Sequence, residues 1–206
     1  IYISTSQVYE SSNRLVTEES KTFAKDSYTK RHLKAENYIL DKNKNGKTDN
    51  FIIRLSNAFG SPINPKTKCW HLAINDFVLN SVKNKKIFIK SDGKQERNFV
   101  SISYFCEAIY FILNYNSEKK NTIFNLGGHQ SYSIYSAANL IADRYFLNSG
   151  NKIQIKTNSL NKSYNLKVSY SSEKIKRLGL KKSSEADFIN EIDSLINYCL
   201  KYKMFI

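Results

Sequence analysis

The chain has 206 residues, 41% of them hydrophobic, which is enough for one large domain or two closely joined small ones and excludes a disordered polymer. No apolar run approaches the ~20 residues that cross a bilayer, so we expect a cytoplasmic protein with no membrane partner. The net charge is +14, but 26 of the 32 basic residues are lysines scattered along the chain and 6 are arginines.

Because arginine is the usual residue for reading base edges, we expect no nucleic acid partner. A generally lysine- and asparagine-rich composition accounts for the charge, although the positive field would attract an anionic small substrate. The three cysteines and three histidines form no paired spacing. This pattern argues against a disulfide framework or a structural zinc site, and we expect no metal.

In chain order, the first half alternates strand and helix. Residues 1–5, 51–56 and 122–127 are short β-branched or aromatic runs, typical of strands that are covered on both faces. Apolar residues at steps of three and four predict helices over 27–42, 70–83 and 103–115, with polar loops at 42–50 and 64–69. This alternation indicates an α/β fold with a parallel sheet.

Further strands and helices follow this alternation or lie within it. Residues 86–100 predict a strand, a turn at Asp92 and Gly93, and a second strand. After Gly150 we expect a strand at KIQIK, a polar loop, and helices over roughly 171–178 and 184–202.

The first candidate site lies where the first strand ends. Ser4, Thr5 and Ser6 follow the apolar run, and ligands of open α/β sheets bind at the carboxyl ends of strands. Hydroxyl groups there either point into a ligand crevice or simply cap the strand as ordinary turn residues. This stretch alone favours the second alternative.

Tyr28 and His32 form the second candidate. They are four residues apart on an expected helix, so both side chains project from one face. A free phenol has a pKa near ~10 and is a poor base at neutral pH, so a catalytic tyrosine needs a cationic or hydrogen-bonding neighbour. An imidazole one turn away could be that neighbour. Equally, the pair could be a packed tyrosine beside a solvated histidine.

Five motifs in order carry a family resemblance. They are ISTSQVY, YTKRHLKAEN, RLSNAFGSP, GKQERNFVSISYFCEAI and IFNLGG. Together they resemble the extended short-chain dehydrogenase/reductase family, in its nucleotide-sugar, NAD-dependent epimerase/dehydratase branch, and the resemblance runs from Ile1 to about Lys182. Each motif is weak alone, whereas five in the right order and spacing are specific.

The resemblance implies a fold and a division of the chain. The fold would be the C-terminal part of a Rossmann-like doubly wound parallel sheet plus a smaller α+β substrate-binding lobe. Residues 1–62 would be the C-terminal portion of the Rossmann domain and 63–96 part of the substrate-binding lobe. Residues 97–130 would return to the Rossmann sheet, and 131–206 would belong mainly to the substrate-binding lobe.

The resemblance also implies roles for particular residues. Thr5 would hydrogen-bond the reacting sugar oxygen, Tyr28 would be the catalytic acid/base, and His32 would assist it. Tyr28, His32 and Ser4 would contact the cofactor, NAD or NADP. Asn57 and Arg97 would join Thr5 in binding a nucleotide-sugar substrate, since a guanidinium suits two phosphate oxygens. A surface arginine is the alternative for Arg97.

Two positions depart from the family pattern. His32 stands where the family has a lysine; neutral imidazole can bond a ribose hydroxyl, and imidazolium would stabilise a tyrosinate. Ser6 and Gln7 stand where 4,6-dehydratases of the family have an Asp-Glu pair. Without those carboxyl groups, elimination of water lacks its acid and base. We therefore expect an epimerase or a reductase.

The glycine-rich fingerprint of dinucleotide binding is the missing motif. The family has GxxGxxG, and no arrangement of the seven glycines here forms it. The chain also begins inside a strand-like run. We therefore expect a fragment of a longer enzyme that is inactive alone.

Two rival functions remain at this stage. One is a catalytically inactive relic or binding module with the same scaffold, and the other is nucleic-acid binding through the positive charge. The resemblance further implies a homodimer that uses the Tyr28 helix, and by analogy a role in polysaccharide biosynthesis.

Overall fold

Three parallel strands form the sheet on which the site is built. The computed structural model describes residues 1–10, 15–42, 50–115, 122–158 and 169–202. The strands are β1 (Tyr2–Thr5), β3 (Phe51–Leu55) and β7 (Thr122–Leu126), in the order β1-β3-β7. The three apolar runs therefore form strands as expected, and the fold is mixed α/β with a parallel sheet. The register aligns Ser4 with Arg54 and Arg54 with Asn125, so one polar row crosses the sheet.

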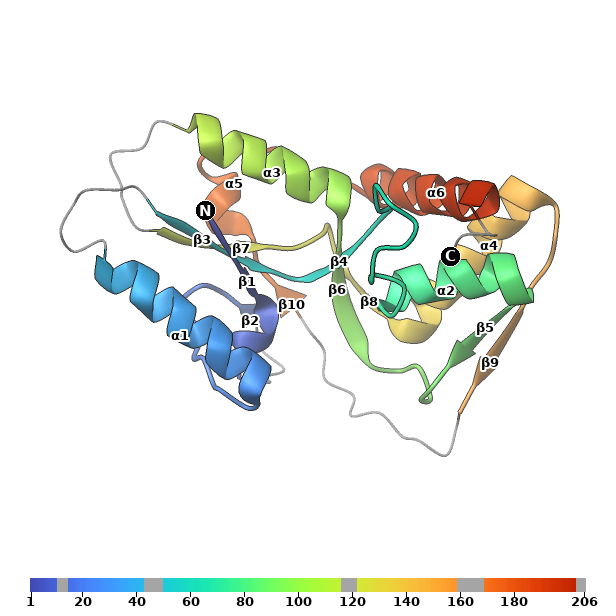
Figure 1. Cartoon of the computed structure of the whole chain (residues 1–206), viewed down its shortest axis with the longest axis horizontal. Helices are drawn as coiled ribbons and strands as arrows, with labels where there is room; N and C mark the ends of the chain where they lie inside the picture. Colours follow the sequence, from blue (N-terminus) through green and yellow to red (C-terminus); the bar gives the residue numbers. More distant parts are fainter. Residues whose placement is uncertain (11–14, 43–49, 116–121, 159–168, 203–206) are drawn as a thin grey trace.

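Helices cover the two faces of this sheet, α1 (Ser27–Lys42) on one and α3 (Ile102–Asn114) on the other (Figure 1). Side chains of a strand alternate between faces. Ile53 accordingly packs with Ala108 and Ile112 of α3, whereas Arg54 contacts Glu36 of α1. The short helix α5 (Glu173–Lys176) also contacts β7.

Local hydrogen bonds set where the two covering helices begin. The Asp26 carboxylate accepts from the Thr29 amide at 2.7 Å, and the Asp26 amide donates to the Thr29 hydroxyl at 3.2 Å. Such reciprocal capping satisfies amides that have no partner within the helix. It fixes Tyr28 as the second residue of α1. Ser101 caps α3 in a similar way, through the amide of Tyr104.

A second group of strands and helices lies beside this sheet. Strand β4 (Asn57–Phe59) runs parallel to β6 (Glu96–Ser101), which pairs antiparallel with β8 (Ser131–Ser133). Strand β5 (Lys86–Ile89) is parallel to β9 (Gln154–Thr157). Helices α2 (Ala73–Asn84), α4 (Ile134–Ser149) and α6 (Glu185–Tyr202) pack around them (Figure 1).

Two large apolar cores hold these groups of elements. One joins β3 and β7 to α3 and α5, and the other joins α2, α4 and α6 to β5. Phe188 of α6 packs edge-on against Phe59 at 5.0 Å between ring centroids. The domain boundaries expected from the sequence stay a prediction.

Several elements differ from the sequence-based expectation. Helix α4 was not anticipated, nor were the short η1 (Ser6–Val8), β2 (Leu15–Val16), β8 and β10 (Ser169–Tyr170), of which β10 pairs with β2. The helix expected from residue 70 begins at Ala73, because Leu72 has an extended backbone. The first strand is covered incompletely, since Ile3 is 37% exposed. Most of the expected loop at 42–50 lies outside the described residues.

Neither a membrane-spanning helix nor a cluster of metal ligands is present among the described residues. None of the helices there is long and apolar enough to cross a membrane. In the same part of the chain, no three His, Cys, Asp or Glu side chains gather as metal ligands would.

Candidate active site

A cleft of about 290 Å³ opens at the carboxyl ends of β1 and β3. Its far wall comes from β6 and the start of α2. The lining residues are Ile3, Ser4, Thr5, Gln7, Tyr28, His32, Leu55, Ser56, Asn57, Ala58, Leu72, Ala73, Ile74 and Phe99. The cleft thus brings together five of the six residues proposed from the sequence. Arg97 is two residues before Phe99 on β6, and so on the same face of that strand.

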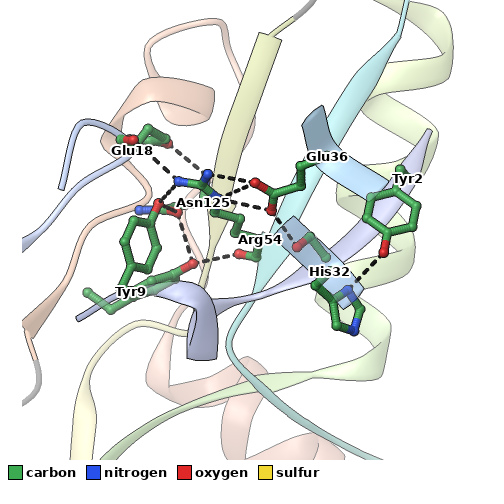
Figure 2. A network of polar contacts seen from close by, with 9 residues as sticks. Tyr2, Tyr9, Glu18, His32, Glu36, Arg54 and Asn125 are labelled. Carbon is green, nitrogen blue, oxygen red and sulfur yellow. Dashed lines mark hydrogen bonds and ion pairs between the residues drawn. The ribbon is translucent and has the colours of Figure 1, made fainter. Parts of the chain in front are cut away.

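Tyr28 and His32 lie together on one wall of the cleft. Their rings meet edge to face, with centroids 4.6 Å apart, and Tyr28 is 47% exposed. The hydroxyl of Tyr2 lies 2.9 Å from Nδ1 of His32 (Figure 2). Burial, together with Glu36 and Tyr28, raises the pKa of Tyr2. Tyr2 therefore stays a protonated phenol, and Tyr28 is the tyrosine that a ligand in the cleft can reach.

Thr5 ends β1 with its hydroxyl already oriented. Its Oγ1 accepts a hydrogen bond of 3.2 Å from the Gln7 amide, which makes Thr5 the cap of η1. Because this bond uses the oxygen as acceptor, the hydroxyl proton is left to donate. Thr5 is nearly buried, and it faces the same cleft as Tyr28.

Ser4 is held by the carboxylate of Glu36. Its hydroxyl donates to Oε1 at 2.5 Å. Arg54 also binds this carboxylate, with Nη2 to Oε2 at 2.7 Å and Nε to Oε1 at 3.1 Å (Figure 2). Side-chain exposure is 2% for Glu36 and 6% for Arg54. Burial alone would lower the pKa of Arg54, but hydrogen bonds with Glu36 and Tyr9 outweigh it and raise the pKa.

Two tyrosines and an asparagine complete this polar cluster. Tyr9 accepts from Nη1 of Arg54 at 3.0 Å and donates to Oδ1 of Asn125 at 2.6 Å. The Tyr170 hydroxyl lies 2.6 Å from the main-chain oxygen of Arg54 and 3.0 Å from the same Asn125 oxygen. Burial raises the pKa of Tyr9 to about 12, against the opposing effect of Arg54. Hydrogen bonds therefore connect the polar row of the sheet both to Glu36 of α1 and to Tyr9 and Tyr170.

Asn57 and Arg97 take part in neutral contacts only, as far as the described residues show. Asn57 donates from Nδ2 to the main-chain oxygen of Asn98 at 2.8 Å. Arg97 donates to the main-chain oxygen of Glu96 and to Oε1 of Gln95, both at 2.9 Å. Burial lowers the pKa of Arg97. A half-buried guanidinium with neutral partners is well suited to binding an anion.

Glu36, Asn125 and Tyr2 were not predicted as members of the site, and Arg54 was identified only as the first residue of the RLSNAFGSP motif. The signal for two of them was present, because Arg54 and Asn125 interrupt otherwise apolar strands. A charge or amide in a buried strand requires a partner. The partner was not deducible, since Glu36 lies 18 residues from Arg54 and on another element. Tyr2 was simply counted with the apolar residues.

The sequence matches one family profile, described as the NAD dependent epimerase/dehydratase family, over residues 1–127. No curated protein sequence gives a significant match. Many solved structures resemble this fold. One is dTDP-glucose 4,6-dehydratase from Bacillus anthracis in complex with NAD, with a TM-score of 0.77 and 19% identity over 98% of this chain.

Two further structures are similar. UDP-glucuronic acid 4-epimerase from Bacillus cereus, in complex with UDP-glucuronic acid and NAD, has a TM-score of 0.76 and 20% identity over 97% of this chain. RMD from Pseudomonas aeruginosa, complexed with NADPH, has a TM-score of 0.80 and 16% identity over 97%. The chain spans 61%, 60% and 66% of the lengths of these three proteins.

Proposed function

Because this chain belongs to the NAD dependent epimerase/dehydratase family, we propose that it forms the catalytic part and the substrate lobe of an NAD(P)-dependent nucleotide-sugar epimerase or reductase. The observation that carries the proposal is the shared cleft of Thr5, Tyr28 and His32. These residues come from a strand end and a helix face, and the motifs that supply them are those of the family.

The cleft suits the nicotinamide and ribose end of NAD or NADP. It lies at the carboxyl edge of a parallel sheet, where open α/β folds bind ligands. The hydroxyl of Ser56, at this cleft, is buried and has no partner among the described residues. Tyr28 and His32 would hold the ribose, and Ser4 would border it. When bound, the dinucleotide accepts and returns a hydride.

Tyr28 is the proposed acid/base. Tyr28 is half-exposed and lines the cleft, so its hydroxyl can reach a sugar there, take the proton of the reacting hydroxyl and later give it back. The neighbouring group on the same helix face is the His32 ring, whose centroid lies 4.6 Å from that of Tyr28. His32 thus replaces the lysine of the family in this proposal.

Thr5 and Arg97 would bind different parts of the substrate. The free proton of the Thr5 hydroxyl can donate to the sugar oxygen as negative charge develops there. Arg97 and Asn57 would bind the diphosphate, since Arg97 has neutral partners and remains available for a second set of bonds.

Epimerisation or reduction is favoured over elimination of water by the residues after Thr5. Ser6 and Gln7 form part of η1, and the side chains of neither can supply a carboxyl acid or base. The proposal therefore predicts oxidation and reduction at a sugar carbon without loss of water.

Turnover of the full-length enzyme to which the proposal assigns this chain, with NAD or NADP and a panel of nucleotide-sugars, tests this function. Tyr28→Phe should lower turnover by about 10²–10⁴-fold, the contribution of a positioned acid/base, while nucleotide-sugar binding persists. Tyr38→Phe is the matched control, because Tyr38 lies on the same helix and is 63% exposed. Equal turnover of Tyr28→Phe and Tyr38→Phe would refute the role of Tyr28.

His32 in place of lysine also supports a second function, a binding module without catalysis. This alternative predicts that the unaltered protein binds a nucleotide-sugar but turns over none in the panel. Turnover with any member of the panel would exclude it.

A further inference from the structure

None of the roles proposed above explains the contact between Tyr2 and His32. Tyr2 lies on β1 and His32 on α1, and the Tyr2 hydroxyl is 2.9 Å from Nδ1 (Figure 2). The two rings are tilted, with centroids 5.9 Å apart. His32 therefore lies between two phenols, Tyr2 and Tyr28, which approach it in different ways.

The direction of this hydrogen bond follows from acidity. A phenol hydroxyl is a stronger acid than the N–H of neutral imidazole, and the unprotonated ring nitrogen is the stronger acceptor. The favoured arrangement is thus a Tyr2 hydroxyl that donates to Nδ1. Because neutral imidazole carries one proton, that proton must then be on Nε2.

The surroundings of Tyr2 keep it in the donating form. The negative charge of Glu36 and burial both disfavour a phenolate at Tyr2, so its pKa is raised. Glu36 is one turn after His32 on α1 and binds Ser4, which is two residues after Tyr2 on β1. Two side-chain bonds therefore join one face of β1 to one face of α1, and one of them is to the imidazole ring itself.

We propose that Tyr2 is a positioning residue that fixes the Nε2–H tautomer of His32, so that a hydrogen-bond donor faces the cleft. His32 lines the cleft, and with Nδ1 occupied by Tyr2 the nitrogen left for a ligand is Nε2. A donor there suits the oxygen of a ribose hydroxyl or of the Tyr28 phenolate. A lysine carries donors only and needs no such partner, whereas a histidine does. The expected effect of Tyr2 on catalysis rests on the proposed function, whereas the tautomer of His32 does not depend on it.

Nitrogen NMR of the imidazole rings tests the tautomer without reference to activity. The full chain is labelled with the NMR-active nitrogen isotope in histidine, and the His32 signals are assigned with His32→Gln. At the alkaline plateau of a titration, Nε2 should resonate as protonated and Nδ1 as unprotonated. In Tyr2→Phe, both resonances should shift toward each other as the tautomers mix.

Tyr38→Phe is the control and should leave these signals unchanged. A protonated Nδ1 in the unaltered protein, or His32 signals that are identical in Tyr2→Phe, would overturn the inference. A circular dichroism spectrum identifies a Tyr2→Phe protein that has failed to fold; in that case Tyr2→Leu, which also lacks the hydroxyl, replaces it.

Kinetics provide the second readout. Tyr2→Phe should lower kcat about five- to tenfold, the effect of one lost hydrogen bond, with little change in KM for the nucleotide-sugar. Unchanged kcat would contradict a positioning role. Failure of the proposed function is distinguishable, because Tyr28→Phe would then retain turnover while the NMR signals still responded to Tyr2→Phe.

Discussion

The buried ion pair between Glu36 and Arg54 allows a quantitative prediction. Replacing Glu36 with glutamine keeps the shape of the side chain but removes its charge. Arg54 would then remain charged and buried, with exposure of 6%, and without its carboxylate. Such a loss of one partner of a buried pair typically costs about 3–5 kcal/mol of stability.

The structure supports the upper half of this range. Arg54 donates to both oxygens of Glu36, with contacts of 2.7, 3.1 and 3.3 Å, and Ser4 donates to the same carboxylate. A glutamine amide can accept at one oxygen only, so at least one of these donors loses its acceptor. We expect Glu36→Gln to lower the free energy of unfolding by about 4 kcal/mol.

Urea unfolding of the full chain, followed by circular dichroism, measures this change. Glu10→Gln is the matched control, because Glu10 pairs with Lys21 at 3.4 Å on the surface, with side-chain exposures of 51% and 77%. Surface pairs contribute about 0–1 kcal/mol. If Glu36→Gln costs no more than Glu10→Gln, the argument that buried charge holds α1 to the sheet is wrong.

Three further predictions concern separate features. In steady-state kinetics, His32→Lys should keep turnover within about tenfold of the unaltered enzyme, whereas His32→Ala should lower turnover by at least ~10²-fold. Equal losses of turnover in the two variants would contradict a role for a nitrogen donor at this position. Gly128→Ala should lower the free energy of unfolding by about 3 kcal/mol or more, because its Cβ would lie 1.8 Å from the main-chain oxygen of Phe99. Gly150→Ala has no atom within 4 Å of its Cβ and is strained only by φ +69, so it should cost ~1 kcal/mol. Similar values for the two variants in urea unfolding would refute the close approach at Gly128. Burial raises the pKa of Tyr9 and of Tyr104 to about 12 in the folded chain. Between pH ~10 and ~12 the unfolded state therefore binds fewer protons than the folded state, and stability should fall as pH rises. Tyr9→Phe should flatten this decline, and an unchanged slope of stability against pH in urea unfolding would contradict the prediction.

Much of the fold was predictable because local pattern and tertiary structure agree. The three parallel strands follow apolar runs, and α1 covers the expected range 27–42. Its fully buried residues are nevertheless Thr29 and Glu36, whereas Tyr28 and Tyr38 are exposed. Helix α4 was missed because its buried face relies on small residues, Ala137 and Ala138, beside Ile141 and Tyr145. A face of that kind gives a weak amphipathic signal, so the helix was overlooked although alanine and leucine favour helix formation.

Strand pairing was less predictable than strand position. Strands β5 and β6 follow one another in the sequence, yet β5 pairs with β9 and β6 pairs with β4 and β8. Each of these pairings spans a long stretch of chain, and the turn at Gly93 between β5 and β6 joins two different sheets. Strand pairings over such long sequence separations cannot be predicted from local sequence patterns.

The site was predictable to the extent that family motifs mark it. Thr5, Tyr28 and His32 were proposed from their motifs, and they share one cleft. Their supporting residues were not, because the bond from Ser4 to Glu36 and the bond from Tyr2 to His32 each join residues at least 30 positions apart. The catalytic roles of the cleft residues stay a prediction until they are measured.

Rapid-mixing absorbance of the nicotinamide is the most direct test of the cleft as a redox site. The full-length enzyme to which the proposal assigns this chain is mixed with its cofactor and a nucleotide-sugar. The band of the reduced nicotinamide is followed in the unaltered protein and in Tyr28→Phe. The account predicts transient reduction in the unaltered protein and none, or at least ~10²-fold slower reduction, in Tyr28→Phe with both ligands bound. Reduction at the same rate in both proteins would contradict it.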